Sequence, residues 1–206
     1  MNDICGLLRP DEVVFGCGHR DDFDVLPAEL QMAAGLAAGR RLDFLAGRTA
    51  ARSALTALGA PRQPVSRGSD GRPVPEGPYI LSIAHDGGRA YAIAANRSSQ
   101  RRGIGLDIID PERAAGMDFQ PVLDRVASPD EPTPKGAAPA ALFSAKEAAL
   151  KALVGAGDAA QSLWHLRLQY GAQGLSAVSV RSGRVCSIVT SFTKHGVAAV
   201  ARVDTV

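Results

Sequence analysis

The stretch that decides the fold is Gly103-Ile104-Gly105-Leu106-Asp107-Ile108-Ile109-Asp110, an apolar run with one carboxylate set into it. Its aliphatic residues predict a strand over residues 103–109. Burying a carboxylate among such neighbours is costly unless the group is paired, so we interpret Asp107 as a functional residue. The alternative is an acid that ends the strand and caps the segment after it.

A second acid lies on a helix predicted over residues 140–154. This helix carries two of the four lysines of the chain, in the segment Phe143-Ser144-Ala145-Lys146-Glu147-Ala148-Ala149-Leu150-Lys151. Glu147 is either a functional acid or the third residue of a capping box that begins at Ser144. The lysines are either functional or surface charges, and Glu147 and Lys151 are spaced for a helix ion pair. A strand acid and a helix acid that meet suffice to hold Mg²⁺ beside a polyphosphate.

Arginine is concentrated between residues 40 and 72, where seven arginines accompany two acids. The planar guanidinium fork suits phosphate, and Arg48 and Arg52 are spaced to share one helix face. A solvated helix face or a nucleic-acid patch would have the same composition. The chain has no basic strand interleaved with aromatic residues of the RNA-recognition kind, so nucleic-acid binding lacks support.

The remaining pattern is a mixture of helices and strands. Apolar residues at helical spacing predict two successive helices within residues 27–59, the second ended by Gly59 and Pro61, and a further helix over residues 119–126. Alternating apolar runs predict strands over residues 64–67, 79–84, 89–95, 163–168, 176–180, 184–191 and 197–203. Four prolines between residues 127 and 139 predict a loop.

Composition is that of an ordinary soluble globular protein, with 46% hydrophobic and 21% charged residues. No apolar run is long enough for a transmembrane helix, and the first residues lack the pattern of a secretory signal. Cys5, Cys17 and Cys186 are widely separated and do not resemble a disulfide framework or a zinc site. We therefore expect a cytoplasmic protein.

The strand and helix segments together resemble the signature of 4′-phosphopantetheinyl transferases, a Gly-Ile/Leu-Asp-Ile strand followed by Phe/Trp-Ser-x-Lys-Glu-x-x-x-Lys. Ser82-Ile83-Ala84-His85-Asp86 resembles the family's Ser-x-Ser/Thr-His segment. Residues 44–52 and Gly71-Arg72-Pro73 resemble the coenzyme A-binding half of the monomeric, surfactin- and enterobactin-type branch. The four motifs occur in the family's order between about Arg40 and Lys151.

The resemblance implies an α+β fold of two similar α/β halves that form a pseudo-dimer, with the active site between them. The halves are expected over residues 1–102, which would bind coenzyme A, and residues 103–206, which would carry the metal site and the catalytic helix. A faint echo between residues 82–95 and 187–201, each a strand, a polar turn and a strand beginning Ser-Ile, agrees with two similar halves.

The implied reaction moves 4′-phosphopantetheine from coenzyme A to a serine of an acyl or peptidyl carrier protein and releases adenosine 3′,5′-bisphosphate. Asp107 and Glu147 would bind Mg²⁺, with Mn²⁺ as the alternative, and Glu147 would act as the base, directly or through water. The residues that match the family's coenzyme A contacts are Arg48, Arg52, Arg72, Pro73, His85 and Lys151. The protein is expected to be a monomer with neither nucleic acid nor a membrane as a partner.

The chain departs from the surfactin-type pattern at two positions. Ile109 stands where that pattern has a second strand carboxylate, and Ala84 stands where Ser or Thr is usual. Asp110 does not replace the missing acid, because strand alternation places it on the face opposite Asp107. The small trimeric holo-synthase branch also lacks the second acid, so two carboxylates and water can suffice. The alternative function is a non-catalytic relative that binds coenzyme A or a carrier protein.

Overall fold

The computed structural model describes residues 14–98, 100–128, 131, 139–172, 174–193 and 196–204. These residues divide into two compact units, one ending at Arg97 and the other beginning at Ser98, and each is considered by itself. Most of the proline-rich loop predicted over residues 127–139 lies outside the described residues. Within them, no helix has the length and apolar character needed to cross a membrane.

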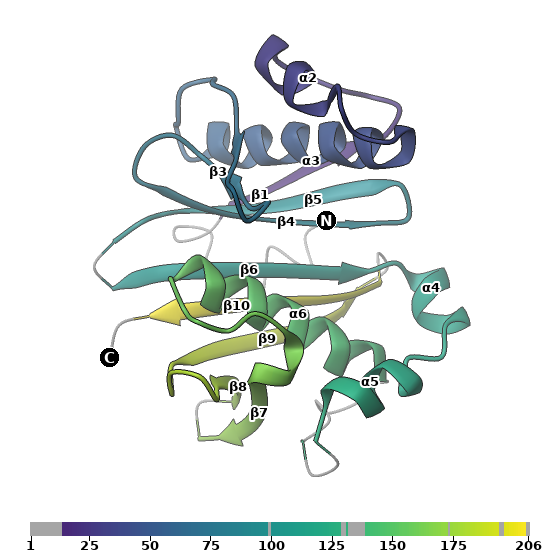
Figure 1. The fold of residues 1–206 in the computed structure, drawn as a ribbon, viewed down its shortest axis with the longest axis vertical. Helices are drawn as coiled ribbons and strands as arrows, with labels where there is room; N and C mark the ends of the chain where they lie inside the picture. Colours follow the sequence, from purple (N-terminus) through teal and green to yellow (C-terminus); the bar gives the residue numbers. More distant parts are fainter. Residues whose placement is uncertain are drawn as a thin grey trace. The chain divides into compact units, whose positions relative to one another are not determined.

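The N-terminal unit is a three-stranded antiparallel sheet, in the order β1-β5-β4, with α3 packed on one face (Figure 1). Its core consists mainly of alanines from α3 and β5, so helix and sheet approach closely. The elements of this unit are β1 (Val14–His19), α2 (Pro27–Ala33), α3 (Ala38–Ala57), β2 (Ser66–Arg67), β3 (Pro73–Val74), β4 (Tyr79–Asp86) and β5 (Arg89–Asn96).

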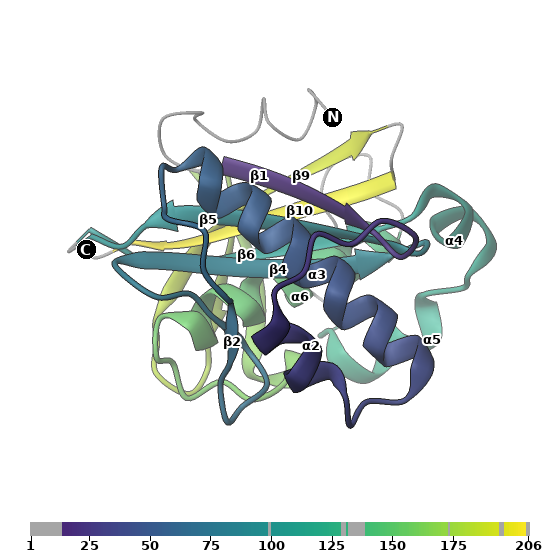
Figure 2. The same cartoon turned by 90° about the horizontal axis from the view of Figure 1, so that it is seen from above.

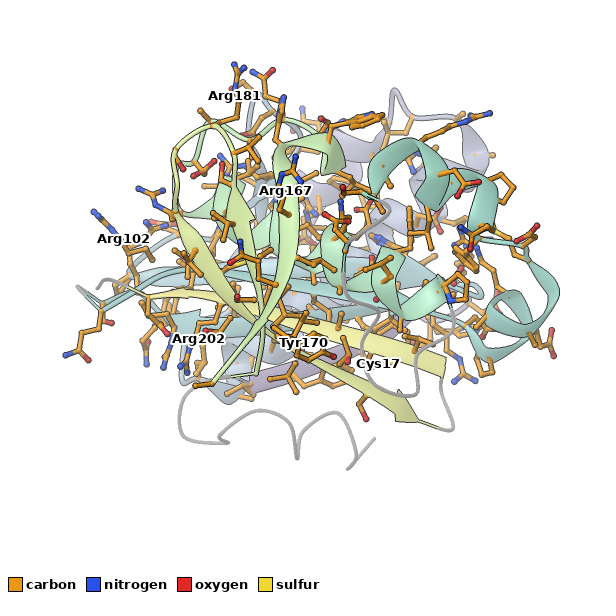
Figure 3. The ribbon with its side chains drawn as sticks, turned by 90° about the horizontal axis from the view of Figure 1, so that it is seen from below. Cys17, Arg102, Arg167, Tyr170, Arg181 and Arg202 are labelled. Carbon is orange, nitrogen blue, oxygen red and sulfur yellow. The ribbon has the colours of Figure 1, made fainter. Side chains whose placement is uncertain are left out.

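The C-terminal unit is a five-stranded antiparallel sheet, in the order β6-β10-β9-β8-β7, with α6 packed on one face. Strand β7 forms one edge, where Arg167 and Tyr170 are exposed (Figure 3). The elements are β6 (Arg101–Ile109), α4 (Pro111–Gly116), α5 (Gln120–Val126), α6 (Pro139–Gly155), a 3₁₀ turn η1 (Leu163–His165), β7 (Leu166–Gly171), β8 (Gly174–Ser179), β9 (Val185–Thr193) and β10 (Gly196–Asp204).

Strand β6 touches the backbone of α6 through two glycines. A Cβ added to Gly105 would lie 1.9 Å from the carbonyl oxygen of Ala148, and one added to Gly103 would lie 2.1 Å from that of Ala152. No side chain fits at such distances, so only glycine allows this approach. The helix therefore lies directly against the strand that carries Asp107.

The N-terminal unit repeats this contact between β1 and α3, which lie side by side (Figures 1 and 2). A Cβ on Gly18 would lie 2.3 Å from the carbonyl oxygen of Ala46, and one on Gly16 would lie 2.1 Å from that of Ala50. Both units thus pair a Gly-x-Gly strand with an alanine-rich helix.

The predicted α+β class is confirmed, and the strand order β1-β5-β4 in one unit matches β6-β10-β9 in the other. The pseudo-dimer arrangement stays a prediction. The two helices predicted within residues 27–59 are present as α2 and α3, with a break between Ala33 and Ala38. Alanines at helical spacing continue through this break, but Gly35 lies within it and disfavours helix. Strand β1 and helix α4 were not predicted.

Candidate active site

Asp107 lies inside β6 and its side chain is 13% exposed. The ammonium group of Lys151, on α6, donates to Asp107 Oδ1 at 2.8 Å and to the carbonyl of Leu106 at 2.9 Å. The capping role considered for Asp107 belongs instead to Asp110, whose Oδ1 accepts a hydrogen bond from the backbone nitrogen of Glu112 at 2.9 Å. Asp107 is therefore a largely buried strand carboxylate paired with a helix lysine.

Glu147 lies in the middle of α6. The helix begins at Pro139, so Ser144 is inside it and the capping-box interpretation of Glu147 is wrong. Burial is the main cause that raises the pKa of Glu147, the charge of Lys151 opposes the rise, and the charge of Asp107 adds to it. The two predicted acids therefore interact electrostatically across the contact between β6 and α6.

The residues present fit a divalent cation. Burial is the main cause that raises the pKa of Glu147 and the charge of Asp107 adds to it, and a bound cation would offset both effects. Within the described part of the chain, no cluster of three or more His, Cys, Asp or Glu side chains is arranged to hold a metal. A cation here would thus have at most two carboxylate ligands from these residues, a number typical of Mg²⁺ beside phosphates.

Lys146 has a different position from the surface one considered from sequence. Its side chain is 1% exposed, and its ammonium lies 2.9 Å from the carboxylate of Glu131. It also donates to the carbonyls of Val126, Leu163 and Leu166, the last at 3.0 Å. Burial lowers the pKa of Lys146 and Glu131 opposes this. Lys146 therefore ties α6 to the segments before and after it.

His85, at the end of β4, lies against α3. Its Nε2 is 2.8 Å from the carbonyl oxygen of Asp43. A Cβ on Gly47 would come within 2.6 Å of the same nitrogen, so a glycine on α3 provides the space for the imidazole. The structure thus places His85, predicted to bind phosphate, against the helix that also carries Arg48.

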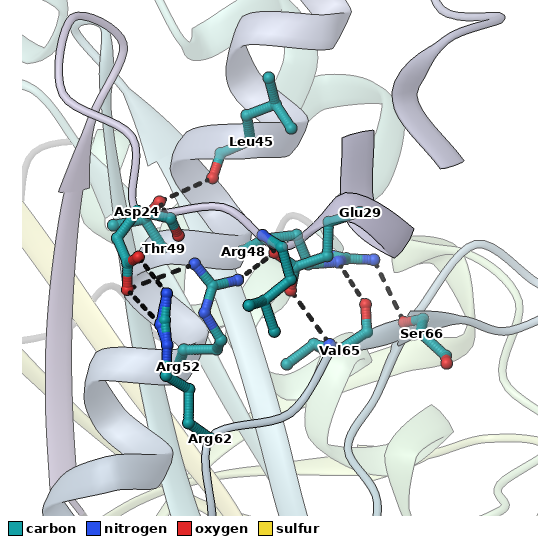
Figure 4. Close-up of polar contacts among 10 residues, drawn as sticks. Asp24, Glu29, Leu45, Arg48, Thr49, Arg52, Arg62, Val65 and Ser66 are labelled. Carbon is teal, nitrogen blue, oxygen red and sulfur yellow. Dashed lines mark hydrogen bonds and ion pairs between the residues drawn. The ribbon is translucent and has the colours of Figure 1, made fainter. Parts of the chain in front are cut away.

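Arg48 and Arg52 are both buried, at 4% and 3% exposure, so the solvated-face interpretation is wrong for them. Arg52 pairs with the fully buried carboxylate of Glu29 (Figure 4). Arg48 donates to the carbonyls of Val65 at 2.8 Å and Ser66 at 3.2 Å. These contacts stabilise the fold of the unit, and a role in binding coenzyme A stays a prediction for both residues.

The short hairpin of β2 and β3 carries Arg72 and Pro73. Arg48 donates a hydrogen bond to the carbonyl of Ser66, the first residue of this hairpin. Arg72 forms a half-exposed ion pair with Asp70 at 2.6 Å. Burial is the main cause that lowers the pKa of Arg48 to about 10, and the positive charge of Arg67 adds to the effect. Arg67 is exposed on β2, opposite Pro73, which makes it a candidate anion-binding residue that the motifs did not single out, although it belongs to the arginine-rich segment.

Two groups of predicted site residues therefore emerge, one in each unit. Asp107, Glu147 and Lys151 come together in the C-terminal unit. In the N-terminal unit, His85 contacts α3, and Arg48 on that helix contacts the hairpin that carries Arg72 and Pro73. That one ligand spans both groups stays a prediction.

Comparison with known proteins shows which family this chain is similar to. Residues 28–95 match the family described as the 4′-phosphopantetheinyl transferase N-terminal domain. The chain is 36% identical over 141 residues to 4′-phosphopantetheinyl transferase Npt of Nocardia iowensis, across 65% of this chain and 61% of that protein. It is also 36% identical over 137 residues to 4′-phosphopantetheinyl transferase PptT of Mycobacterium tuberculosis, across 62% of this chain and 57% of that protein.

These matches support assigning the chain to the 4′-phosphopantetheinyl transferases, the family that its motifs resemble. The chain spans less than two thirds of the length of the curated relatives it matches. The branch within the family stays a prediction.

Proposed function

We propose that this protein transfers 4′-phosphopantetheine from coenzyme A to a serine of an apo carrier protein and releases adenosine 3′,5′-bisphosphate. The observation that supports this most is the close backbone contact between β6, which carries Asp107, and α6, which carries Glu147, since the charge of Asp107 acts on Glu147 across it. Phosphoryl transfer requires mainly positioning and charge stabilisation, and two acids held by backbone contact provide the positioning. The proposal includes a monomeric protein acting in the cytoplasm.

In this proposal Asp107 and Glu147 hold Mg²⁺, which when bound would polarise the phosphoanhydride bond and stabilise the leaving group. Glu147 then accepts the proton of the attacking serine, directly or through water. Lys151 uses two of its three N–H groups on Asp107 and Leu106, which leaves one for a phosphate oxygen.

The N-terminal unit provides the proposed coenzyme A-binding residues. His85 and Arg72 are exposed and suit phosphate contacts, with Pro73 beside Arg72. Arg48 and Arg52 contribute positive charge from buried positions, and we expect their main effect to be on the shape of this surface.

The direct test is to incubate the protein with an apo carrier protein, coenzyme A and Mg²⁺ and to weigh the carrier by mass spectrometry. We expect an adduct of the phosphopantetheine mass. Asp107→Ala and Glu147→Ala should each reduce the rate at least about 100-fold, because each removes one of few metal ligands. Asp110→Asn is the matched control, since it alters the next acid but preserves a good helix cap.

The outcomes of this test separate the transferase from the non-catalytic alternative and also test the metal site. Coenzyme A binding without any adduct would support the non-catalytic alternative. An adduct formed by Asp107→Ala at more than about a tenth of the wild-type rate, at saturating Mg²⁺, would contradict the metal site.

A further inference from the structure

The contact between β6 and α6 has a regular register. Every second residue of the strand faces the helix and lies opposite one of its turns. Gly103 lies against Ala152, and Gly105 lies against Ala148, one turn earlier in the helix. Further along the strand, Ile109 packs in a cluster with Ala140 and Ala141 at the start of α6. Two strand residues thus advance one helix turn throughout.

Asp107 falls between Gly105 and Ile109 in this register, and Ser144 falls between Ala148 and Ala140. Asp107 therefore lies opposite the turn that carries Ser144, and Glu147 lies on the next turn of the same helix. The ion pair of Asp107 with Lys151 shows that its carboxylate faces α6. Ser144 thus carries a hydroxyl on the helix turn opposite Asp107.

Ser144 is also an unusual residue in energetic terms. It is 0% exposed, and its hydroxyl has no hydrogen-bond partner among the described residues. A buried hydroxyl without a partner destabilises a folded protein, and an alanine would fill the same place without that cost. An unpaired polar group held at a site is a candidate for binding something that the chain itself does not provide.

The chemistry of a two-carboxylate site indicates which partner the Ser144 hydroxyl could bind. Mg²⁺ takes six oxygen ligands in near-octahedral geometry and keeps several waters. Where a second strand carboxylate would otherwise reach the metal, Ile109 packs against Phe119 and Val197 and has no oxygen to offer. A water at the site needs polar partners in the protein to fix its position.

We propose that Ser144 is a positioning residue whose hydroxyl orders a water ligand of the divalent cation held by Asp107 and Glu147. This inference rests on the proposed function, because it requires that metal site. The hydroxyl acts on the cation through the water and compensates for the missing acid at position 109.

The test compares the Mn²⁺ affinity of purified variants, measured from the free Mn²⁺ signal in electron paramagnetic resonance, with their thermal unfolding. Ser144→Ala should weaken Mn²⁺ binding about tenfold, as loss of a group that orients metal ligands does. Its melting temperature should equal or exceed that of the wild type, because an unpaired hydroxyl is removed.

Ser179→Ala is the matched control. Ser179 is also 0% exposed, but its hydroxyl donates to Asp158 Oδ1 at 2.7 Å. Its loss should lower the melting temperature and leave Mn²⁺ affinity unchanged, the opposite of the result expected for Ser144→Ala.

Unchanged Mn²⁺ affinity in Ser144→Ala would overturn the inference, and so would a melting temperature that falls as far as that of the control. Asp107→Ala separates this failure from failure of the proposed function. If Asp107→Ala binds Mn²⁺ as the wild type does, the metal site itself is wrong. If only Asp107→Ala loses affinity, the metal site stands and Ser144 has no part in it.

Discussion

The two units share the Gly-x-Gly contact between strand and helix, but they carry opposite charges just beyond it. Two residues after the second glycine, the N-terminal unit has Arg20, which pairs with Asp43 on α3 at 2.6 Å. At the corresponding place the C-terminal unit has Asp107, which pairs with Lys151 on α6 at 2.8 Å. The first unit has the cation next to the strand and the anion on the helix, and the second has the reverse.

The comparison shows which part of the arrangement the fold requires. The glycines are needed in both units because backbone meets backbone there. The charge of the following residue can have either sign as long as the helix provides the opposite one. The C-terminal unit adds a second acid, Glu147, whose pKa the charge of Asp107 helps to raise, and this second acid is what the proposed cation site requires.

Breaking the shared contact should have the largest effect. Gly105→Ala and Gly16→Ala should each lower the free energy of unfolding by at least about 3 kcal/mol, because the new Cβ would overlap a helix carbonyl. Urea denaturation measures the free energy of unfolding of each variant. Gly39→Ala is the control, since a Cβ there meets nothing within 4 Å. A loss below about 1 kcal/mol in either variant would show that the strand can move away without penalty.

In each unit a basic residue of the long helix forms a buried ion pair with a distant acid, Arg52 with Glu29 and Lys146 with Glu131. Arg52→Met and Lys146→Met should each cost about 3–5 kcal/mol of unfolding free energy, because the acid is left buried and unpaired. The double variant Lys146→Met, Glu131→Gln should lose less than the sum of its single changes.

Arg72→Met is the control for this experiment, because its ion pair with Asp70 is half exposed and its loss should leave unfolding close to wild type. Weaker coenzyme A binding by Arg52→Met without any loss of stability would contradict the structural role given to Arg52.

The smallest effect is expected at Arg20. Its side chain is 40% exposed, so Arg20→Ala should reduce the free energy of unfolding by no more than about 1 kcal/mol and leave transfer to the carrier unchanged. A double-mutant cycle with Asp43→Ala measures the pair itself. A coupling energy above about 2 kcal/mol would mean that this ion pair is a structural requirement of the contact and not an interchangeable one.

The sequence predicted most of the sheet and helix positions, because alternating apolar residues and alanine-rich helices have clear periods. It also predicted that Asp107 and Glu147 interact, through the resemblance of their motifs. Strand β1 was missed because Gly16 and Gly18 weaken the strand pattern, although these are the residues that let it pack on α3. Helix α4 had a signal that was overlooked, an N-cap aspartate at position 110 followed by Pro111.

The burial of Lys146 could not be predicted from its neighbours. A lysine on a helix gives the same local pattern whether it faces solvent or a remote acid, and Glu131 lies in a segment whose path the sequence does not specify. The same holds for Arg52 and Glu29, which are brought together only when α2 packs on α3. Pairings between distant charged residues depend on tertiary structure and not on periodicity.

The glycines of β6 have one further consequence, for how sharply the separation of the two acids is defined. Where side chains separate a strand from a helix, rotamer changes let the gap widen or narrow. Here the spacer is a peptide backbone, which has no rotamers to sample. Substitutions elsewhere in the core can then accumulate while Asp107 and Glu147 keep the same separation, so the unit can tolerate sequence drift around a site of constant span.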